Sequence, residues 1–413
     1  MPPRRVRHTV VGLTLTLSFI TYLDRVAIST AAPSIRDELH LTPSQLAWAF
    51  SAFTIAYALF EIPTGRLGDV YGTRRVLTRI VLWWSAFTAL TGAVWSLPSL
   101  IVTRFLFGAG EAGAYPNISK TFARWLPQSE RGNAHGMMFL GSRLGGALAP
   151  PVVVWATALF GWRAAFFVCG VIGLLWAAVW WGWFRDAPEE HPSVSPDELR
   201  TIVAGREGQA AEKRWPILFD RNLLVLCLMY FCVIYGLYFY LTWLPTYFEE
   251  ARGFSAPQAA GLASMVLLTG GVATVVGGQL TDILLRRRGR RVARSIGLVS
   301  LPLSGLAFIT AAETSSPIFA AVMFAGATAG ADIALSAIWG ICHDIGEDAA
   351  GTVTGVMNTF GNIGGALSPL VVGYMIQGGA PWSAPLVVGG IIYIVGGVLT
   401  AFINPNRPLR YAK

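Results

Sequence analysis

Twelve long runs of apolar residues constrain the fold of this 413-residue chain more than any other feature. With edges good to a few residues, they cover 10–32, 45–64, 76–95, 100–123, 133–159, 164–184, 223–248, 258–285, 295–312, 318–341, 352–376 and 384–403. A helix that crosses a bilayer needs ~20 such residues, and lipid offers no partner for open backbone groups. Only 13% of the chain is charged, about half the share in soluble proteins. The pattern predicts an all-α membrane protein with twelve transmembrane helices.

Arginine and lysine lie almost entirely on one side of the predicted membrane. They occupy both ends of the chain and the even-numbered connections, such as the cluster at 286–291, whereas the opposite loops hold only Arg36, Arg163 and Arg252. By the positive-inside rule, both termini lie in the cytoplasm. The same rule accounts for the net charge of +8 without a nucleic-acid partner.

The chain shows no sign of a metal, disulfide or nucleotide site. Its four cysteines lie in or beside apolar runs and are interpreted as packed thiols, and its five histidines lack metal-ligand spacing. Gly108-x-Gly110-x-x-Gly113 matches the dinucleotide fingerprint, but without the preceding strand that this mechanism needs. We therefore expect no cofactor and no enzymatic activity.

Two segments recur in the same order. GRLGD at 65–69 returns as GQLTD at 278–282, and GGALAP at 145–150 returns as GGALSP at 364–369. Duplicated halves around a midplane site are a transporter architecture. We predict two pseudo-symmetric six-helix bundles, residues 1–184 and 220–413, whose paired glycines serve close helix packing.

A hydrophilic linker, 185–219, joins the two predicted bundles. Within it, Ser195-Pro196-Asp197-Glu198 is a good helix start, because it offers a capping serine, a proline at the first position and acids in the first turn. We expect a short amphipathic helix there, on the cytoplasmic face.

Three motifs resemble a known transporter family. The loop Gly65-x-Leu67-x-Asp69-x-x-Gly72-x-Arg74-Arg75 resembles the signature of the major facilitator superfamily, although Val70 stands where a basic residue is more usual. The segments at 22–25 (YLDR) and 104–116, with its GAGEAGAYP, are similar to the anion:cation symporter branch, which includes bacterial carriers of sugar acids. The resemblance covers essentially the whole chain, and implies the facilitator fold in a bacterial inner membrane. It also implies gating roles, which we assign to Asp69, Arg74 and Asp282.

Charged residues inside the predicted helices need pairing or a water-filled cavity, because each is disfavoured by ~2.5–3.5 kcal/mol at a helix centre. Arg104, Gly108, Glu111 and Tyr115 form one stripe along the fourth run. Arg104 and Glu111 lie ~10 Å apart along the axis, so each is expected to meet a group on another helix. A Glu111 without a tight partner would be partly desolvated, and such a carboxylate can load and unload a proton.

The first half also holds the predicted anion-binding residues. Arg25, with hydroxyls from Tyr22 and Tyr57, would bind a carboxylate, because a guanidinium fork matches that group. Ser142 lies where related sugar-acid carriers often use a hydroxyl or amide, and the adjoining Arg143 serves either a more charged substrate or an internal pair.

Proton coupling is assigned to neighbouring acids. Asp24 and Glu111 would take protons, and Arg104 would modulate Glu111. The resemblance implies similar roles at these positions and at Arg25. The alternative is that the same residues only form a buried packing network.

In the second half, Asp332, Ser336 and Trp339 follow one helix face, and Asn358 lies on the next run. Ser336, Trp339 and Asn358 resemble the family's substrate positions, whereas Asp332 has no such counterpart. An ordinary core or interfacial role is the alternative for Trp339.

Together these features predict a monomeric secondary transporter in the lipid bilayer that imports a small organic anion, of sugar-acid type, with protons by alternating access. A proton-coupled drug or metabolite antiporter of the same superfamily is the rival. Such an antiporter would not need Arg25 and Arg104 to face the cavity.

Overall fold

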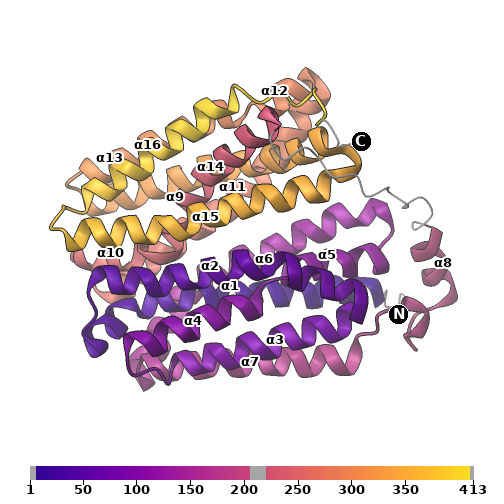
Figure 1. The fold of residues 1–413 in the computed structure, drawn as a ribbon, viewed down its shortest axis with the longest axis horizontal. Coiled ribbons are helices and arrows are strands. Elements are labelled where there is room, and N and C mark those ends of the chain that lie inside the picture. The colour runs from indigo at the N-terminus through magenta and orange to yellow at the C-terminus, as the bar shows by residue number, and fades with distance from the viewer. Residues whose placement is uncertain (1–5, 205–219, 410–413) are drawn as a thin grey trace. The chain divides into compact units, whose positions relative to one another are not determined.

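The computed structural model describes residues 6–204 and 220–409, and every regular element in these ranges is a helix (Figure 1). The first group comprises α1 (Val6–Leu39), α2 (Pro43–Tyr71), α3 (Thr73–Thr91), α4 (Leu97–Glu111), α5 (Ala114–Trp125), α6 (Gln128–Phe160), α7 (Trp162–Trp183), η1 (Pro188–Glu190) and α8 (Pro196–Ala204). The second comprises α9 (Arg221–Thr242), α10 (Leu244–Glu250), α11 (Ala256–Arg288), α12 (Arg290–Arg294), α13 (Gly297–Glu313), α14 (Pro317–Gly346), η2 (Glu347–Ala349), α15 (Ala350–Gln377) and α16 (Ser383–Thr400).

The helices form two compact units. Unit 1 comprises Met1–Ala31 and Ile55–Ala210, and unit 2 comprises Ala32–Thr54 and Ala211–Lys413. The end of α1 and the start of α2 thus belong to unit 2, whereas the sequence assigned them to the bundle 1–184. The boundary of the predicted linker falls among residues 205–219, which lie outside the described part of the chain.

Within residues 6–204 and 220–409, ten helices are long and apolar enough to cross a membrane. The two other predicted spans correspond to α3 and to the pair α4 and α5. The 19-residue α3 carries Arg74, Arg75 and Arg79 in its first two turns. The other span is divided into helices of 15 and 12 residues.

The division between α4 and α5 corrects the prediction of one continuous stripe through Tyr115. Gly113 has a φ of 85°, a left-handed conformation that glycine adopts at little cost. Pro116 has no backbone N–H to donate to the Ala112 carbonyl. Thr64 of α2 supplies that donor instead, with its Oγ1 2.8 Å from the Ala112 oxygen. Arg104, Gly108 and Glu111 therefore share α4, whereas Tyr115 begins a new helix.

The repeated glycines occupy equivalent contacts in the two units. A Cβ added at Gly145 of α6 would lie 2.0 Å from the Phe19 carbonyl oxygen of α1. A Cβ at Gly364 of α15 would lie 2.5 Å from the Phe231 carbonyl oxygen of α9. The predicted close packing is confirmed at both positions. A Cβ added at Gly146, by contrast, would meet only side-chain atoms at ordinary distances.

The linker helix begins where the sequence placed it. In α8, the Glu198 backbone N–H donates to the Ser195 hydroxyl at 3.2 Å. The Glu198 carboxylate then accepts from the backbone N–H groups of Val6 and Arg7 at 3.1 and 3.0 Å. A glutamate of the linker therefore caps the N-terminus of α1, where a negative charge is favoured.

Each arginine on the predicted outer side has a structural partner. Arg163 donates to the Gly92 and Val94 carbonyls beyond the end of α3. Arg252 donates to the Ala311 and Thr314 carbonyls at the end of α13. Arg36 forms an ion pair with Glu250, with Nη1 2.5 Å from Oε1. Local bonding therefore explains why cations stand there, against the general charge asymmetry.

Candidate functional site

Arg25 and Glu111 form a buried ion pair in unit 1. Arg25 Nε lies 2.5 Å from Glu111 Oε1, and its Nη2 also contacts that oxygen. The Glu111 side chain is fully buried, and that of Arg25 is 11% exposed. Glu111 thus meets a group on another helix, as predicted, and Arg25 is a close partner for it.

Two tyrosine rings enclose the Arg25 guanidinium. Its Cζ lies 5.2 Å from the centre of the Tyr22 ring and 4.7 Å from that of Tyr57. The sequence assigned hydroxyls to these tyrosines, whereas the structure presents their ring faces to the cation. Such stacking favours arginine over lysine, because the planar guanidinium matches an aromatic face.

Asp24 lies one residue away and faces α3 instead of the Arg25 pair. It is buried, and its Oδ2 accepts from the Thr88 hydroxyl at 3.3 Å. Within the described residues, Asp24 Oδ1 and Glu111 Oε2 have no hydrogen-bond partner. Each acid therefore keeps one buried oxygen on which a proton can be carried.

Arg104 completes the charged cluster. It is 2% exposed, and its guanidinium lies 4.4 Å from the centre of the Phe107 ring. It interacts electrostatically with Glu111 and Asp24. The cluster thus contains two arginines and two carboxylates, so that a proton added to either acid changes its net charge.

Ser142 is placed beside Tyr115 at the start of α5. Their hydroxyl oxygens lie 2.8 Å apart, and the Tyr115 ring stacks on Phe139 of α6. Of these, sequence analysis singled out only Ser142 as a substrate residue. The hydroxyl pair joins α5 to α6 just beyond the helix break.

In unit 2, three of the predicted residues lie on α14 and Asn358 lies on α15. Asp332 is 3% exposed and packs against α11, where a Cβ added at Gly270 would lie 2.3 Å from Asp332 Oδ2. Ser336 and Trp339 are half-buried, and the Trp339 ring meets Tyr230 edge-on at 6.3 Å.

The predicted gating residues have separate partners. Asp69 forms an ion pair with Lys120 of α5 at 2.6 Å, and the same ammonium donates to the Gly65 carbonyl. Arg74 instead donates to the Trp181 carbonyl of α7 and stacks on its ring. Asp282 is exposed and has no ion pair within the described ranges.

Thr88 and Lys120 were missed by sequence analysis. Lys120 was detectable as a basic residue late in an apolar run, where a nearby acid is the expected partner. Thr88 gave no signal, because a threonine in an apolar helix is common and commonly bonds its own backbone.

Comparison with known proteins places this chain in a family. The model of the Major Facilitator Superfamily matches residues 14–369. The probable sulfoacetate transporter SauU of Cupriavidus necator is 38% identical over 97% of this chain and 94% of its own. The probable galactarate/D-glucarate transporter GudP of Bacillus subtilis is 30% identical over 93% and 89%.

A solved structure supports the fold. A bacterial homolog of the human lysosomal transporter Spinster superimposes with a TM-score of 0.79 at 19% identity, over 97% of both chains. The predicted facilitator fold and family are confirmed. The chain belongs to the major facilitator superfamily, whose members are membrane transporters and not enzymes.

Proposed function

We propose that this protein is a secondary active transporter that imports a small organic anion, of the sugar-acid or sulfoacetate type, together with protons by alternating access. The enclosed Arg25–Glu111 pair carries the proposal, because it puts a cation suited to an anionic substrate in contact with a group that can be protonated. The names of the relatives support the substrate class.

In this mechanism Arg25 exchanges partners. Without substrate, its guanidinium binds Glu111 and is held between the rings of Tyr22 and Tyr57. A proton on Glu111 removes the competing negative charge, so that the substrate carboxylate or sulfonate takes its place. The anion then binds well only when a proton is bound, which is the requirement for symport.

Asp24 supplies a second protonation site. Each pH unit across the membrane contributes ~1.4 kcal/mol per proton, and 100 mV contributes ~2.3 kcal/mol per net charge. An inside-negative potential assists entry of a monoanion only when at least two protons accompany it. Asp24 and Glu111 provide two carboxyls, and Arg104 tunes both through its charge.

The test is uptake into proteoliposomes that contain a pH dye, with an imposed pH gradient. The panel holds sulfoacetate, aldonates, uronates, aldarates and aromatic acids. We expect internal acidification with one class of acid, and its loss in Arg25→Ala. In Arg25→Lys the rate of internal acidification should fall at least about tenfold. The reason is that a guanidinium, which can bind a carboxylate with two hydrogen bonds and stack on the tyrosine rings, is replaced by a point charge.

Glu111→Gln should still bind the anion but no longer couple it to protons, so that counterflow persists and acidification disappears. The matched control is Glu130→Gln, which makes the same change in a glutamate paired with Arg7 near the start of α6. Movement of protons with lipophilic cations, and with no acid, would overturn the proposal in favour of an antiporter.

A further inference from the structure

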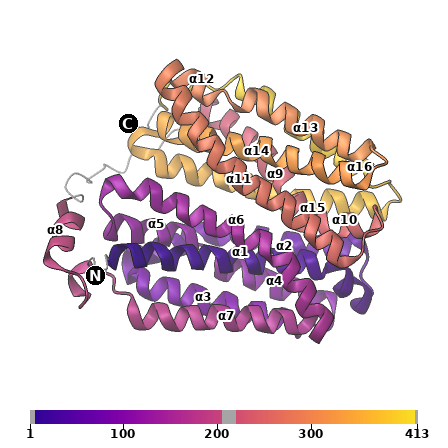
Figure 2. The same ribbon diagram turned by 180° about the vertical axis from the view of Figure 1, so that it is seen from behind.

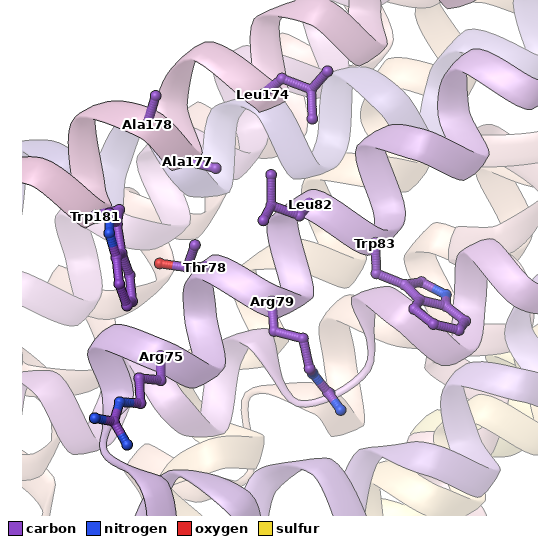
Figure 3. A pocket seen from close by; sticks show the side chains of 9 residues that line it. All are labelled: Arg75, Thr78, Arg79, Leu82, Trp83, Leu174, Ala177, Ala178 and Trp181. Carbon is purple, nitrogen blue, oxygen red and sulfur yellow. The ribbon is translucent and has the colours of Figure 1, made fainter.

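A groove of about 780 Å³ runs between α3 and α7 of unit 1 (Figure 3). The two helices lie side by side in Figure 1 and in Figure 2. α3 contributes side chains from Arg75 to Trp83 at helical spacing, and α7 contributes the facing stripe from Leu174 to Trp181. Small side chains at Ala177 and Ala178 of α7 leave the space open.

The stems of two arginines, Arg75 and Arg79, line one end of this groove. Arg75 and Arg79 are exposed, and neither guanidinium has a hydrogen bond or ion pair within the described ranges. The neighbouring acid, Asp186, is already engaged, because its Oδ1 accepts from the Arg74 backbone N–H at 2.9 Å and from the Thr73 hydroxyl. The two guanidiniums therefore remain available to an external anion.

The rest of the groove is apolar. Leu82 and Trp83 are 44% and 45% exposed, and Trp181 is 46% exposed. Arg75 precedes Leu82 by seven residues, or ~10 Å along the helix axis. A ligand that fills the groove therefore needs an anionic end and an apolar chain that begins within about one helix diameter of it.

An anionic phospholipid has this shape and charge. Guanidinium groups suit phosphate oxygens, and basic pockets between membrane helices on the cytoplasmic side bind anionic headgroups. The predicted orientation places the start of α3 on that side. Arginines that act only as topology signals require no concave surface beside them, whereas these two line the end of one.

We propose that the groove between α3 and α7 is a binding site for an anionic phospholipid, whose headgroup phosphate contacts Arg75 and Arg79 and whose acyl chain lies along Leu82 and Ala178. The site lies within unit 1 and is independent of the proposed substrate residues.

The test is native mass spectrometry of the full-length protein in detergent with added phosphatidylglycerol or phosphatidylcholine. We expect the protein to retain phosphatidylglycerol but not phosphatidylcholine. In the double variant Arg75→Gln/Arg79→Gln, the affinity for phosphatidylglycerol should fall about tenfold or more. The matched control is Arg287→Gln/Arg288→Gln, which removes the same charge from exposed positions at the end of α11. Equal losses in the two double variants would overturn the proposal.

A second pair of variants tests the groove without changing its charge. Ala178→Phe fills the groove, whereas Val179→Phe adds a ring at an exposed position outside the lining. Only Ala178→Phe should lower retention of phosphatidylglycerol. Displacement of the lipid by an equal concentration of soluble glycerol phosphate would contradict the site, because the apolar part would then contribute nothing.

Discussion

Thr64 completes the break between α4 and α5 with one hydroxyl group. Its single hydroxyl proton is shared between the Ala112 carbonyl at 2.8 Å and the Phe60 carbonyl at 2.5 Å. Because Pro116 has no N–H, the Ala112 oxygen has no helical donor. Gly113 lies so close that an added Cβ would stand 2.4 Å from Thr64 Oγ1. Thr64, which lies 48 residues before Ala112, thus acts with Gly113 and Pro116 to shape the segment beside Glu111.

Thr64→Val should therefore lower the free energy of unfolding by about 1–3 kcal/mol, because it leaves a buried carbonyl without a donor. Thermal unfolding in detergent measures the change. The control is Thr269→Val, where a half-buried threonine bonds only the Met265 carbonyl of its own helix. Equal shifts in both variants would show that the bond between Thr64 and Ala112 contributes nothing.

At the scale of the element, contact between helix backbones is decided by single glycines. A Cβ added at Gly145 would collide with the α1 backbone, whereas a Cβ added at the adjacent Gly146 would lie 3.6 Å from Tyr22 Cδ1 and 3.8 Å from Val26. The two residues look the same in the repeated motif. Because they point in different directions from the axis of α6, only Gly145 permits close contact with the α1 backbone.

Gly145→Ala should destabilise the protein by about 1–3 kcal/mol or more, because the new methyl group meets a carbonyl that cannot move alone. Gly146→Ala should be neutral or stabilising by up to about 1 kcal/mol, because alanine favours the helix. Thermal unfolding of the two variants shows whether each substitution lowers or raises the stability. Equal destabilisation would contradict the packing of α1 against α6.

At the scale of the whole molecule, the hairpin Ala32–Thr54 is part of unit 2 although its flanking residues belong to unit 1. Ser51 donates to the Ala366 carbonyl at 2.7 Å, and Trp48 Nε1 donates to the Tyr374 hydroxyl at 3.1 Å. The Arg36–Glu250 pair adds a charged contact to α10. These bonds show that the hairpin is held by both polar and charged groups of unit 2.

The acids around this contact predict a pH dependence. Burial, with the nearby charges of Glu250 and Asp37, raises the pKa of Glu249 to about 7. Burial also raises the pKa of Glu250, opposed by Arg36. Between about pH 4.5 and 7, the folded protein holds a proton that the unfolded chain has released, so the free energy of unfolding falls as pH rises through that window.

Glu249→Gln should reduce the dependence of the free energy of unfolding on pH. It should therefore raise the unfolding temperature at pH 8 more than at pH 5. Thermal unfolding at the two pH values measures it. Glu190→Gln, at an exposed glutamate of η1, is the control and should leave the slope unchanged. A slope that persists in Glu249→Gln would assign the effect to other groups.

The sequence by itself determined the helical spans, the start of α8 and the family. These depend on local runs and motifs, because a membrane helix must satisfy its own backbone and present apolar side chains to lipid. The signal for the break in the fourth span was also local, since Gly113 and Pro116 are breakers three residues apart. It was outweighed by the length of the apolar run.

Only the tertiary structure decided which charges meet. Arg25 and Glu111 are 86 residues apart, and Arg36 reaches Glu250 from another helix. A sequence shows that a buried charge needs a partner, but several partners satisfy that need equally well. The choice is made by the rotation and depth of each helix, which close glycine contacts such as Gly145 against Phe19 help to set.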